Sequence, residues 1–192
     1  MMKKVYVSFG EMEKAFNRVR RELEGQGLLF AGSRLDKVDC YYEGLSFGGL
    51  AGCVGIMGFY NPKKSDKAIH IPAVFPMALF PWWDGREILD VIRHEFGHAL
   101  ADRFRKLFRG AIFKEAFGGG YGEKKVFDGY EWERGCVSAY AATSTREDFA
   151  ETFMLYMKHK GKLPARYRGK RAVEKKWKAV ARIIRIVSSM GC

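Results

Sequence analysis

The chain has 192 residues, of which 47% are hydrophobic and 15% aromatic, and it carries a formal net charge of +12. This length suits one folded domain spanning residues 1–192, and the composition supplies enough apolar side chains for its core. No stretch reaches the ~18 uninterrupted apolar residues of a membrane span, and the first residues lack the apolar run of a signal peptide. The sequence therefore predicts a soluble, cytoplasmic protein without membrane partners.

The first part of the chain is predicted to be one helix followed by strands. Residues 11–24 place apolar side chains at helical spacing, and Gly25 and Gly27 follow as stop signals. Residues 28–80 are rich in glycine, aromatic and β-branched residues. Strands are predicted there in LLFAG (28–32), VDCYYEGLSF (38–47), CVGIMGFY (53–60) and KAIHIPAVF (67–75).

Prolines indicate that the strand at 67–75 is an edge strand or that they mark the exit from it. Pro72, Pro76 and Pro81 fall in or just after it. Proline has no N–H to donate to a neighbouring strand, so it is rare in central strands.

Three helices are predicted in the rest of the chain. The first begins near Gly85, where Asp84 and Glu87 have the spacing of a capping box. Its broad apolar face comprises Ile88, Val91, Ile92, Phe96, Ala99, Leu100 and Phe104. A second helix begins after Ser144, which forms a capping box with Glu147, and ends near residue 159. A third helix spans about 170–189 and carries an apolar stripe of Val173, Trp177, Val180, Ile184 and Val187.

The composition carries two further indications. The four cysteines, at positions 40, 53, 136 and 192, include no Cys-x-x-Cys pair, so they are not expected to bind zinc. Gln26, Asn17 and Asn61 are the sole side-chain amides, whereas Lys, Arg and Glu are abundant. This bias resembles that of proteins from hyperthermophiles.

The positive charge leaves a binding function open. Much of it lies in the last thirty residues and in RFRKLFR (103–109). A basic surface of this kind can bind nucleic acid or an acidic protein, although no nucleic-acid-binding motif accompanies it. A solvated helix face is the simpler interpretation.

The segment RHEFGHALADRF (93–104) contains a His-Glu-x-x-His motif within the first of these three helices. His94 and His98 are four residues apart, so on a helix they share a face and can bind one metal ion. Glu95 is placed to act as a general base on a zinc-bound water without being a ligand. Two histidines and a glutamate inside an apolar helix would be costly unless they were paired or ligated.

A catalytic zinc site needs a third protein ligand. The remaining histidines are weak candidates, because His70 is expected on a strand surface and His159 in a solvated helix end. Glu147 and Glu151 are better candidates, since they are four residues apart and share a helix face. One of these carboxylates can bind zinc and the other can accept the free N–H of a zinc-bound histidine. Tyr140, just before the helix, is placed to stabilise an oxyanion.

This arrangement resembles the gluzincins, which are zinc peptidases with two histidines and a downstream glutamate as ligands. The segments HEFGHALAD and YAATSTREDFAETF are most similar to the anthrax lethal factor catalytic domain and the related Pro-Pro endopeptidases. The resemblance implies Glu147 as the third ligand, Glu151 as its supporting carboxylate and Tyr140 as a transition-state stabiliser. It covers about 25 residues firmly and 85–160 loosely.

The resemblance also implies a fold and an activity. The fold would be α+β and zincin-like, with a helix and a small mixed sheet on the active-site helix and a helical lobe after it. The upper lobe would span about 1–108 and the lower lobe about 109–192. The activity would be that of an endopeptidase with one Zn²⁺ per chain, with the strand at 67–75 aligning a peptide substrate. The alternative is a zinc-stabilised or catalytically latent protein that binds nucleic acid or an acidic partner through its basic surface.

Overall fold

The structure is a computed structural model that describes residues 7–43, 59–62, 67–72, 87–124 and 132–190. It has the following elements: α1 (Phe9–Gly25), β1 (Cys40–Glu43), β2 (Phe59–Tyr60), β3 (Ile69–Pro72), α3 (Ile88–Arg103), α4 (Arg105–Phe108), α5 (Ala111–Phe117), α6 (Trp132–Gly135), the 3₁₀ turn η2 (Tyr140–Thr143), α7 (Thr145–Lys158), the 3₁₀ turn η3 (Ala165–Tyr167) and α8 (Arg171–Ser189). The predicted α+β class is therefore confirmed. No helix in these ranges is both long and apolar enough to cross a membrane.

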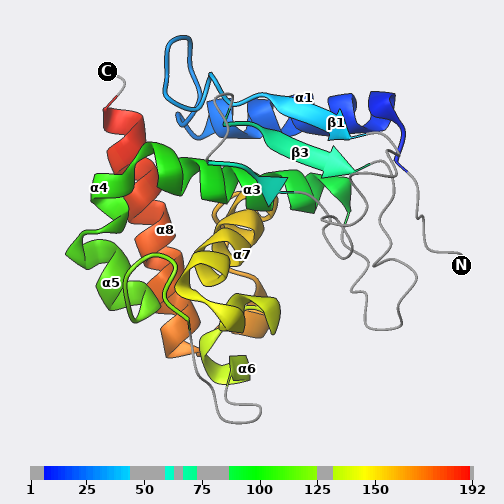
Figure 1. Ribbon diagram of the computed structural model, residues 1–192. Coiled ribbons are helices and arrows are strands. Elements are labelled where there is room, and N and C mark those ends of the chain that lie inside the picture. Colours follow the sequence, from blue (N-terminus) through cyan, green and yellow to red (C-terminus); the bar gives the residue numbers. More distant parts are fainter. Residues whose placement is uncertain (1–6, 44–58, 63–66, 73–86, 125–131, 191–192) are drawn as a thin grey trace, which may run out of the picture.

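The helix α3 runs through the middle of the molecule. Figure 1 shows α1 and the sheet on one side of α3, and α5, α7 and most of α8 on the other. Every residue from 90 to 101 on α3 is buried, so this helix has no solvated face along these three turns. The predicted apolar face accounts for much of this burial, and the charged residues Asp90, Arg93 and Glu95 are buried with it.

The small sheet differs from the prediction. Its strand order is β1-β3-β2, with β3 parallel to β1 and antiparallel to β2. The prediction that 67–75 is an edge strand is therefore wrong, since β3 is central, whereas the alternative, that the prolines mark the exit from the strand, agrees with Pro72. Proline is tolerated because Pro72 is the last residue of β3. Pro76 and Pro81 lie outside the described residues.

Residues 28–32 form turns instead of the predicted strand. The Ser33 hydroxyl accepts hydrogen bonds from the backbone N–H groups of Phe30 and Asp36, and Gly32 has a positive φ of 82°. Leu28 and Leu29 are nevertheless buried, so their apolar character reflects the core and not a strand.

The four predicted helices are present with small shifts at their ends, whereas α4, α5 and α6 were not predicted. Ser8 caps α1 in a capping box with Glu11. Ser144 caps α7 by accepting the N–H of Glu147, but the predicted capping box is incomplete because the Glu147 carboxylate faces His94. The helix α3 begins at Ile88, with Glu87 as an N-cap that makes no side-chain hydrogen bond; Asp84 lies outside the described residues.

The C-terminal helix α8 belongs to the core. All five residues of its predicted apolar stripe are buried. Its Lys176 is also buried, with Nζ 2.5 Å from Oδ2 of Asp148 on α7. This helix is therefore held by apolar packing and a buried ion pair, which favours a structural role.

The crossing of α3 and α7 is unusually close. A Cβ atom added to Gly97 would lie 3.1 Å from Cα of Ala150 and 3.3 Å from Cδ1 of Phe153. Gly97 therefore makes room for another helix, not for a strand or a substrate. Because Ala150 lies between Glu147 and Glu151 in the chain, this contact brings both carboxylates towards α3.

An ionic network links α1, α3 and α7 through the buried side chains of Arg93 and Asp90. The guanidinium of Arg93 on α3 donates two hydrogen bonds to Glu22 on α1, at 2.7 and 2.8 Å, and a third to Asp90. Asp90 also pairs with Lys158 at the end of α7, at 2.6 Å. Removing one partner of such a network leaves a buried charge without compensation, so its geometry is strongly constrained.

Cys40 is half-buried and Cys136 is buried, and the two are not joined in a disulfide; Cys53 and Cys192 lie outside the described residues. The division into an upper lobe at 1–108 and a lower lobe at 109–192 stays a prediction.

Candidate metal centre

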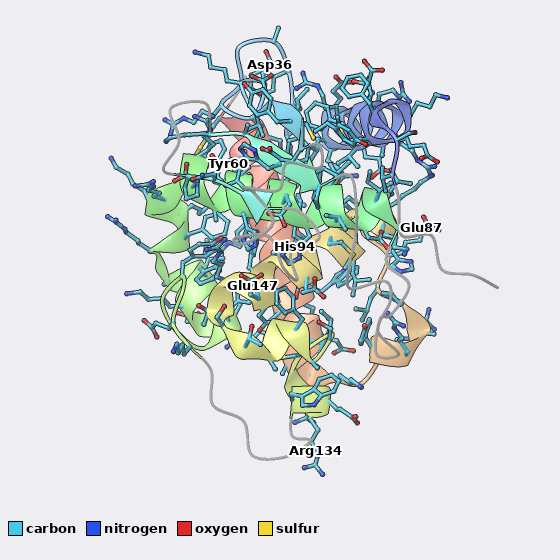
Figure 2. The ribbon with its side chains drawn as sticks, turned by 45° about the vertical axis from the view of Figure 1, so that its right-hand side comes forward. Asp36, Tyr60, Glu87, His94, Arg134 and Glu147 are labelled. Atoms are coloured by element: carbon cyan, nitrogen blue, oxygen red, sulfur yellow. The ribbon has the colours of Figure 1, made fainter. Side chains whose placement is uncertain are left out.

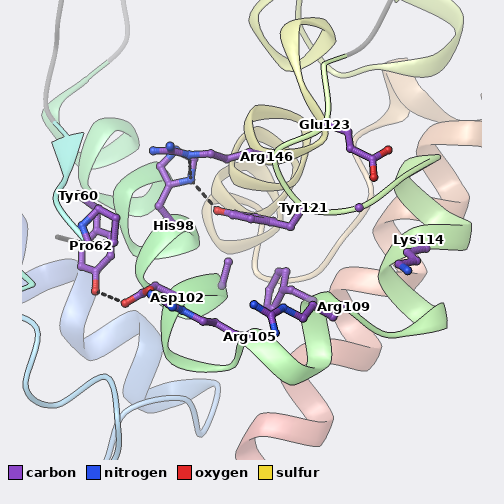
Figure 3. Close-up of a pocket in the computed structure, with 13 residues that line it drawn as sticks. Tyr60, Pro62, His98, Asp102, Arg105, Arg109, Lys114, Tyr121, Glu123 and Arg146 are labelled. Atoms are coloured by element: carbon purple, nitrogen blue, oxygen red, sulfur yellow. Dashed lines mark hydrogen bonds and ion pairs between the residues drawn. The ribbon is translucent and has the colours of Figure 1, made fainter.

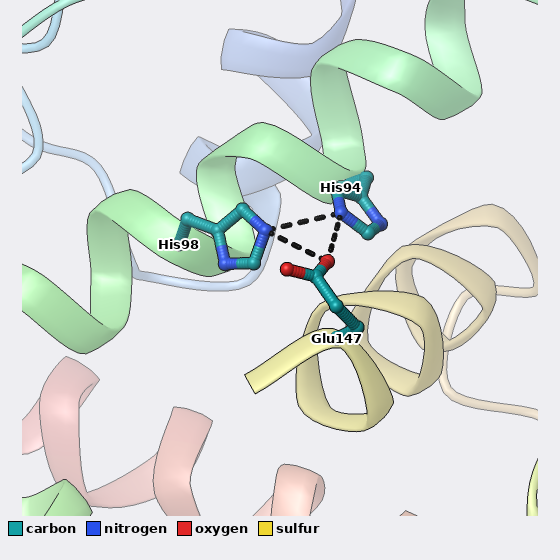
Figure 4. Close-up of side chains that lie close together, drawn as sticks. All are labelled: His94, His98 and Glu147. Carbon is teal, nitrogen blue, oxygen red and sulfur yellow. Dashed lines mark hydrogen bonds and ion pairs between the residues drawn. The ribbon is translucent and has the colours of Figure 1, made fainter. Parts of the chain in front are cut away.

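Three side chains from two helices converge at the α3–α7 crossing. Nε2 of His94 lies 3.1 Å from Nε2 of His98 and 3.1 Å from Oε2 of Glu147. Nε2 of His98 lies 3.2 Å from the same Glu147 oxygen. Figure 4 shows the two imidazoles and the carboxylate facing one another. Within the described ranges this is the group of His, Cys, Asp and Glu side chains that could hold a metal ion.

The dimensions of this triangle suit zinc. Tetrahedral bonds of about 2.0–2.1 Å place any two ligand atoms about 3.3 Å apart. The three observed separations of 3.1–3.2 Å are close to that value. A Zn²⁺ ion would therefore need little rearrangement to bind His94, His98 and Glu147, and it would keep a fourth position for another ligand.

The second nitrogen of His94 is also held. Nδ1 lies 2.8 Å from Oε1 of Glu151, and the other oxygen of Glu151 accepts a 2.8 Å hydrogen bond from the Ser138 hydroxyl. Glu151 is 1% exposed. A carboxylate at Nδ1 keeps the proton on that nitrogen and leaves the Nε2 lone pair for a metal. This is the supporting role expected for Glu151.

His98 has a comparable partner that the sequence did not single out. The hydroxyl of Tyr121 lies 3.1 Å from Nδ1 of His98 and can accept its proton. Nε of Arg146 lies 3.4 Å from the same nitrogen and 3.5 Å from Oε1 of Glu147. The local pattern GGGYG, which reads as a loop, gives no signal that its tyrosine faces the site; Arg146, adjacent to Glu147, could have been suspected from position alone.

Glu95 lies beside the cluster and does not belong to the three converging ligands. Its Oε2 accepts a 2.7 Å hydrogen bond from the backbone N–H of Tyr60 on β2. Burial raises the pKa of Glu95 to about 7, and the neighbouring His94 opposes that rise. A carboxylate with such a pKa can both accept and return a proton near neutral pH.

Tyr140 lies on η2 next to His94. Its ring centroid is 5.8 Å from that of His94, and the residue is 46% exposed. Burial of the hydroxyl and the nearby Glu147 carboxylate raise the pKa of Tyr140 above its ordinary value. The phenol is therefore a proton-carrying donor at the border between the cluster and solvent.

The charges in the cluster are unequally distributed. Burial opposes a charged His94, but hydrogen bonds to Glu147 and Glu151 outweigh it and raise the pKa of His94 to about 10. Burial lowers the pKa of His98 to about 4. Burial alone would raise the pKa of Glu147, yet its bonds to both histidines lower it. The metal-free cluster is thus one imidazolium, one neutral imidazole and one carboxylate.

The other two histidines lie outside the cluster. His70 on β3 is 2% exposed, so the expectation of a strand-surface residue is wrong; its Nδ1 lies 2.5 Å from Oε1 of Glu43 on β1. His159 is the C-cap of α7, where it is partly exposed. In Figure 2, His94 and Glu147 lie near the middle of the molecule, with Tyr60 above them.

Comparisons with protein-family models, with curated proteins and with solved structures found no match to this chain.

Proposed function

We propose that the protein is a zinc-dependent endopeptidase of the gluzincin type, with a zincin-like fold whose upper and lower lobes meet at α3. The observation that carries this proposal is the convergence of Nε2 of His94, Nε2 of His98 and Oε2 of Glu147 within 3.2 Å. In addition, a carboxylate or hydroxyl oxygen lies within 3.1 Å of each Nδ1 atom. A solvated pair of helix-surface histidines would need neither feature.

His94, His98 and Glu147 would hold one Zn²⁺ per chain. Zinc in such a site supplies a Lewis acid that polarises a peptide carbonyl and acidifies a water molecule. Glu151 and Tyr121 would keep the two imidazoles in the ligating orientation. The close crossing at Gly97 holds the helix that carries Glu147 against the helix that carries both histidines.

Glu95 would move the proton. The hydrogen bond from the Tyr60 N–H holds one of its oxygens, so the carboxylate is oriented without being a ligand. It would take a proton as water attacks the peptide carbonyl and deliver that proton to the leaving amine. The Tyr140 hydroxyl would donate to the oxyanion.

The strand that lies beside the site is β2, not β3. The Tyr60 N–H of this edge strand is directed to Glu95, whereas β3 is enclosed by β1 and β2. The role expected of 67–75 in aligning an extended peptide therefore lacks a free strand edge at β3, and on β2 the Tyr60 N–H is already used by Glu95.

The proposal is tested by Glu95→Gln. Glutamine keeps the size of the side chain and an oxygen for the Tyr60 N–H, but it cannot act as a base. The variant should retain zinc by elemental analysis and hydrolyse unfolded casein about 10²–10⁴-fold more slowly than wild type. Glu13→Gln, an exposed change on α1, is the matched control. Wild-type rates in the zinc-loaded Glu95→Gln variant would remove Glu95 from the mechanism.

A further inference from the structure

A cavity of about 570 Å³ adjoins the metal cluster on the side of His98. His98 and Arg146 line its inner end, and Figure 3 shows Tyr121 between them and the outer residues. The cavity therefore begins at a predicted metal ligand, where part of a bound peptide would have to lie. It is lined chiefly by α3, α4, α5 and the loop that carries Tyr121.

The charged side chains of this cavity are mostly cationic. Arg105, Arg109, Lys114 and Arg146 line it, against two acidic side chains, Asp102 and Glu123. The balance is two positive charges. An excess of one sign in a cleft with low-dielectric walls attracts ligands of the other sign.

The acidic residue Asp102 is already neutralised. Its carboxylate accepts a 2.9 Å hydrogen bond from Nε of Arg105, and Nζ of Lys67 lies 3.3 Å away. The Tyr60 hydroxyl donates to it at 3.1 Å. Asp102 and Arg105 therefore cancel one another and leave the charge of the cavity to its remaining residues.

The other acidic residue, Glu123, is folded back on its own loop. Its carboxylate oxygens occupy the space that a Cβ atom would fill at Gly119 or at Gly120. The two glycines thus make room for this carboxylate. Within the described ranges, neither Arg109 nor Lys114 has an ion pair with an acidic side chain, and both are exposed.

Apolar side chains form the rest of the wall. Ala101, Phe108 and Pro62 lie there together with the ring of Tyr121. Such a wall suits the methylene stem or backbone of a peptide, while the cations at Arg109 and Lys114 suit an anionic end. One carboxylate can accept a charge-assisted hydrogen bond from a guanidinium group and another from an ammonium group.

We propose that this cavity is a substrate subsite that selects a peptide carboxylate, through Arg109 and Lys114, next to the bond presented at the metal centre. This inference rests on the proposed peptidase function and adds a substrate class to it. The carboxylate can come from an acidic side chain or from the C-terminus of the substrate. Amidation of the C-terminus would leave recognition of an acidic side chain intact but would remove recognition of a terminal carboxylate.

The test compares binding of capped alanine hexapeptides to the zinc-loaded Glu95→Gln chain. One series carries a single Glu or its amide Gln at each position, and one pair differs in having a free or an amidated C-terminus. Exposed ion pairs contribute about 0.2–1 kcal/mol each, so two such contacts correspond to a preference of about 2- to 30-fold for the carboxylate member. Preference for Glu at one position assigns an acidic side chain, and preference for the free acid alone assigns the C-terminus.

The charge-reversed variant Arg109→Glu with Lys114→Glu should abolish that preference. Its matched control is Lys14→Glu with Arg21→Glu, two exposed changes on α1 that alter the net charge equally. Equal affinity for carboxylate and amide peptides, or a preference that survives in the reversed variant as in the control, would overturn the subsite.

The subsite and the peptidase function can fail separately. Hydrolysis of neutral peptides by wild type, with no carboxylate preference, would leave the peptidase and remove the subsite. Carboxylate preference in binding, with no hydrolysis of any peptide by the zinc-loaded wild type, would leave the subsite and remove the peptidase. Absence of both binding and hydrolysis would remove both.

Discussion

Nδ1 of His94 lies 2.8 Å from Oε1 of Glu151, a buried carboxylate one helical turn after Glu147. The two acids of α7 therefore hold opposite nitrogens of the same imidazole. Glu147 faces Nε2, where a metal would bind, and Glu151 fixes the proton on Nδ1. The helical spacing of four residues is what allows one helix to perform both tasks.

Glu151→Ala should weaken zinc binding by about 10- to 100-fold, because His94 loses the acceptor that fixes its tautomer. Glu151→Gln should have a smaller effect, since its carbonyl oxygen can still accept from Nδ1. Competition with a chromophoric chelator measures both affinities. Wild-type affinity in a folded Glu151→Ala protein would show that this carboxylate does not support the site.

Zinc affinity should rise with pH because zinc and a proton compete for Nε2 of His94. In the metal-free chain the pKa of His94 is raised to about 10, so at pH 7 this site holds a proton that zinc must displace. His98, with a pKa lowered to about 4, has no proton to release. The apparent affinity should therefore increase about tenfold per pH unit between pH 6 and 9 from this group.

Calorimetry in buffers of different ionisation enthalpy checks this directly. At least one proton should be released per zinc bound near pH 7, since His94 gives up one and the part-protonated Glu95 beside the cation adds to it. Zinc binding without proton release, or an affinity that is flat over this range, would contradict the assigned charge state.

Gly97→Ala should destabilise the protein despite the better helix propensity of alanine. Alanine gains up to about 1 kcal/mol in a helix, whereas overpacking costs about 1–3 kcal/mol. The added methyl group would press on Cα of Ala150, a backbone atom that yields only if α7 moves. Both the unfolding free energy and zinc affinity should fall.

The matched control for this prediction is Gly10→Ala in the first turn of α1, where an added Cβ meets nothing within 4 Å. That change should be neutral or stabilising by up to about 1 kcal/mol in denaturant unfolding. If Gly97→Ala were as stable as Gly10→Ala and bound zinc normally, the close crossing would not position the ligands.

The features predicted correctly are those that depend on residues close to one another in the sequence. The i, i+4 spacings of His94 with His98 and of Glu147 with Glu151 predicted which side chains share a helix face. The Ser144 cap and the apolar stripe of α8 were also predictable, because helix ends and amphipathic faces are determined by residues near one another in the sequence.

Features that depend on contacts between residues far apart in the sequence were not predicted. The central position of β3 follows from its neighbours β1 and β2, and no pattern within 67–75 specifies them. Tyr121 reaches His98 from a loop 23 residues away, and Arg93 reaches Glu22 across 71 residues. Gly97 lies within the His-Glu-x-x-His motif, but the reason for a glycine there, the approach of Ala150, is visible only in the packed structure.

The account depends most on the three-ligand zinc site, and elemental analysis of the metal content tests it most directly. Wild type and Glu147→Ala should be purified side by side without chelator, with Glu13→Ala as a matched control on the exposed face of α1. We predict about one zinc per chain in wild type and control and clear loss in Glu147→Ala. Wild type without metal, or Glu147→Ala with a full complement, would contradict the site.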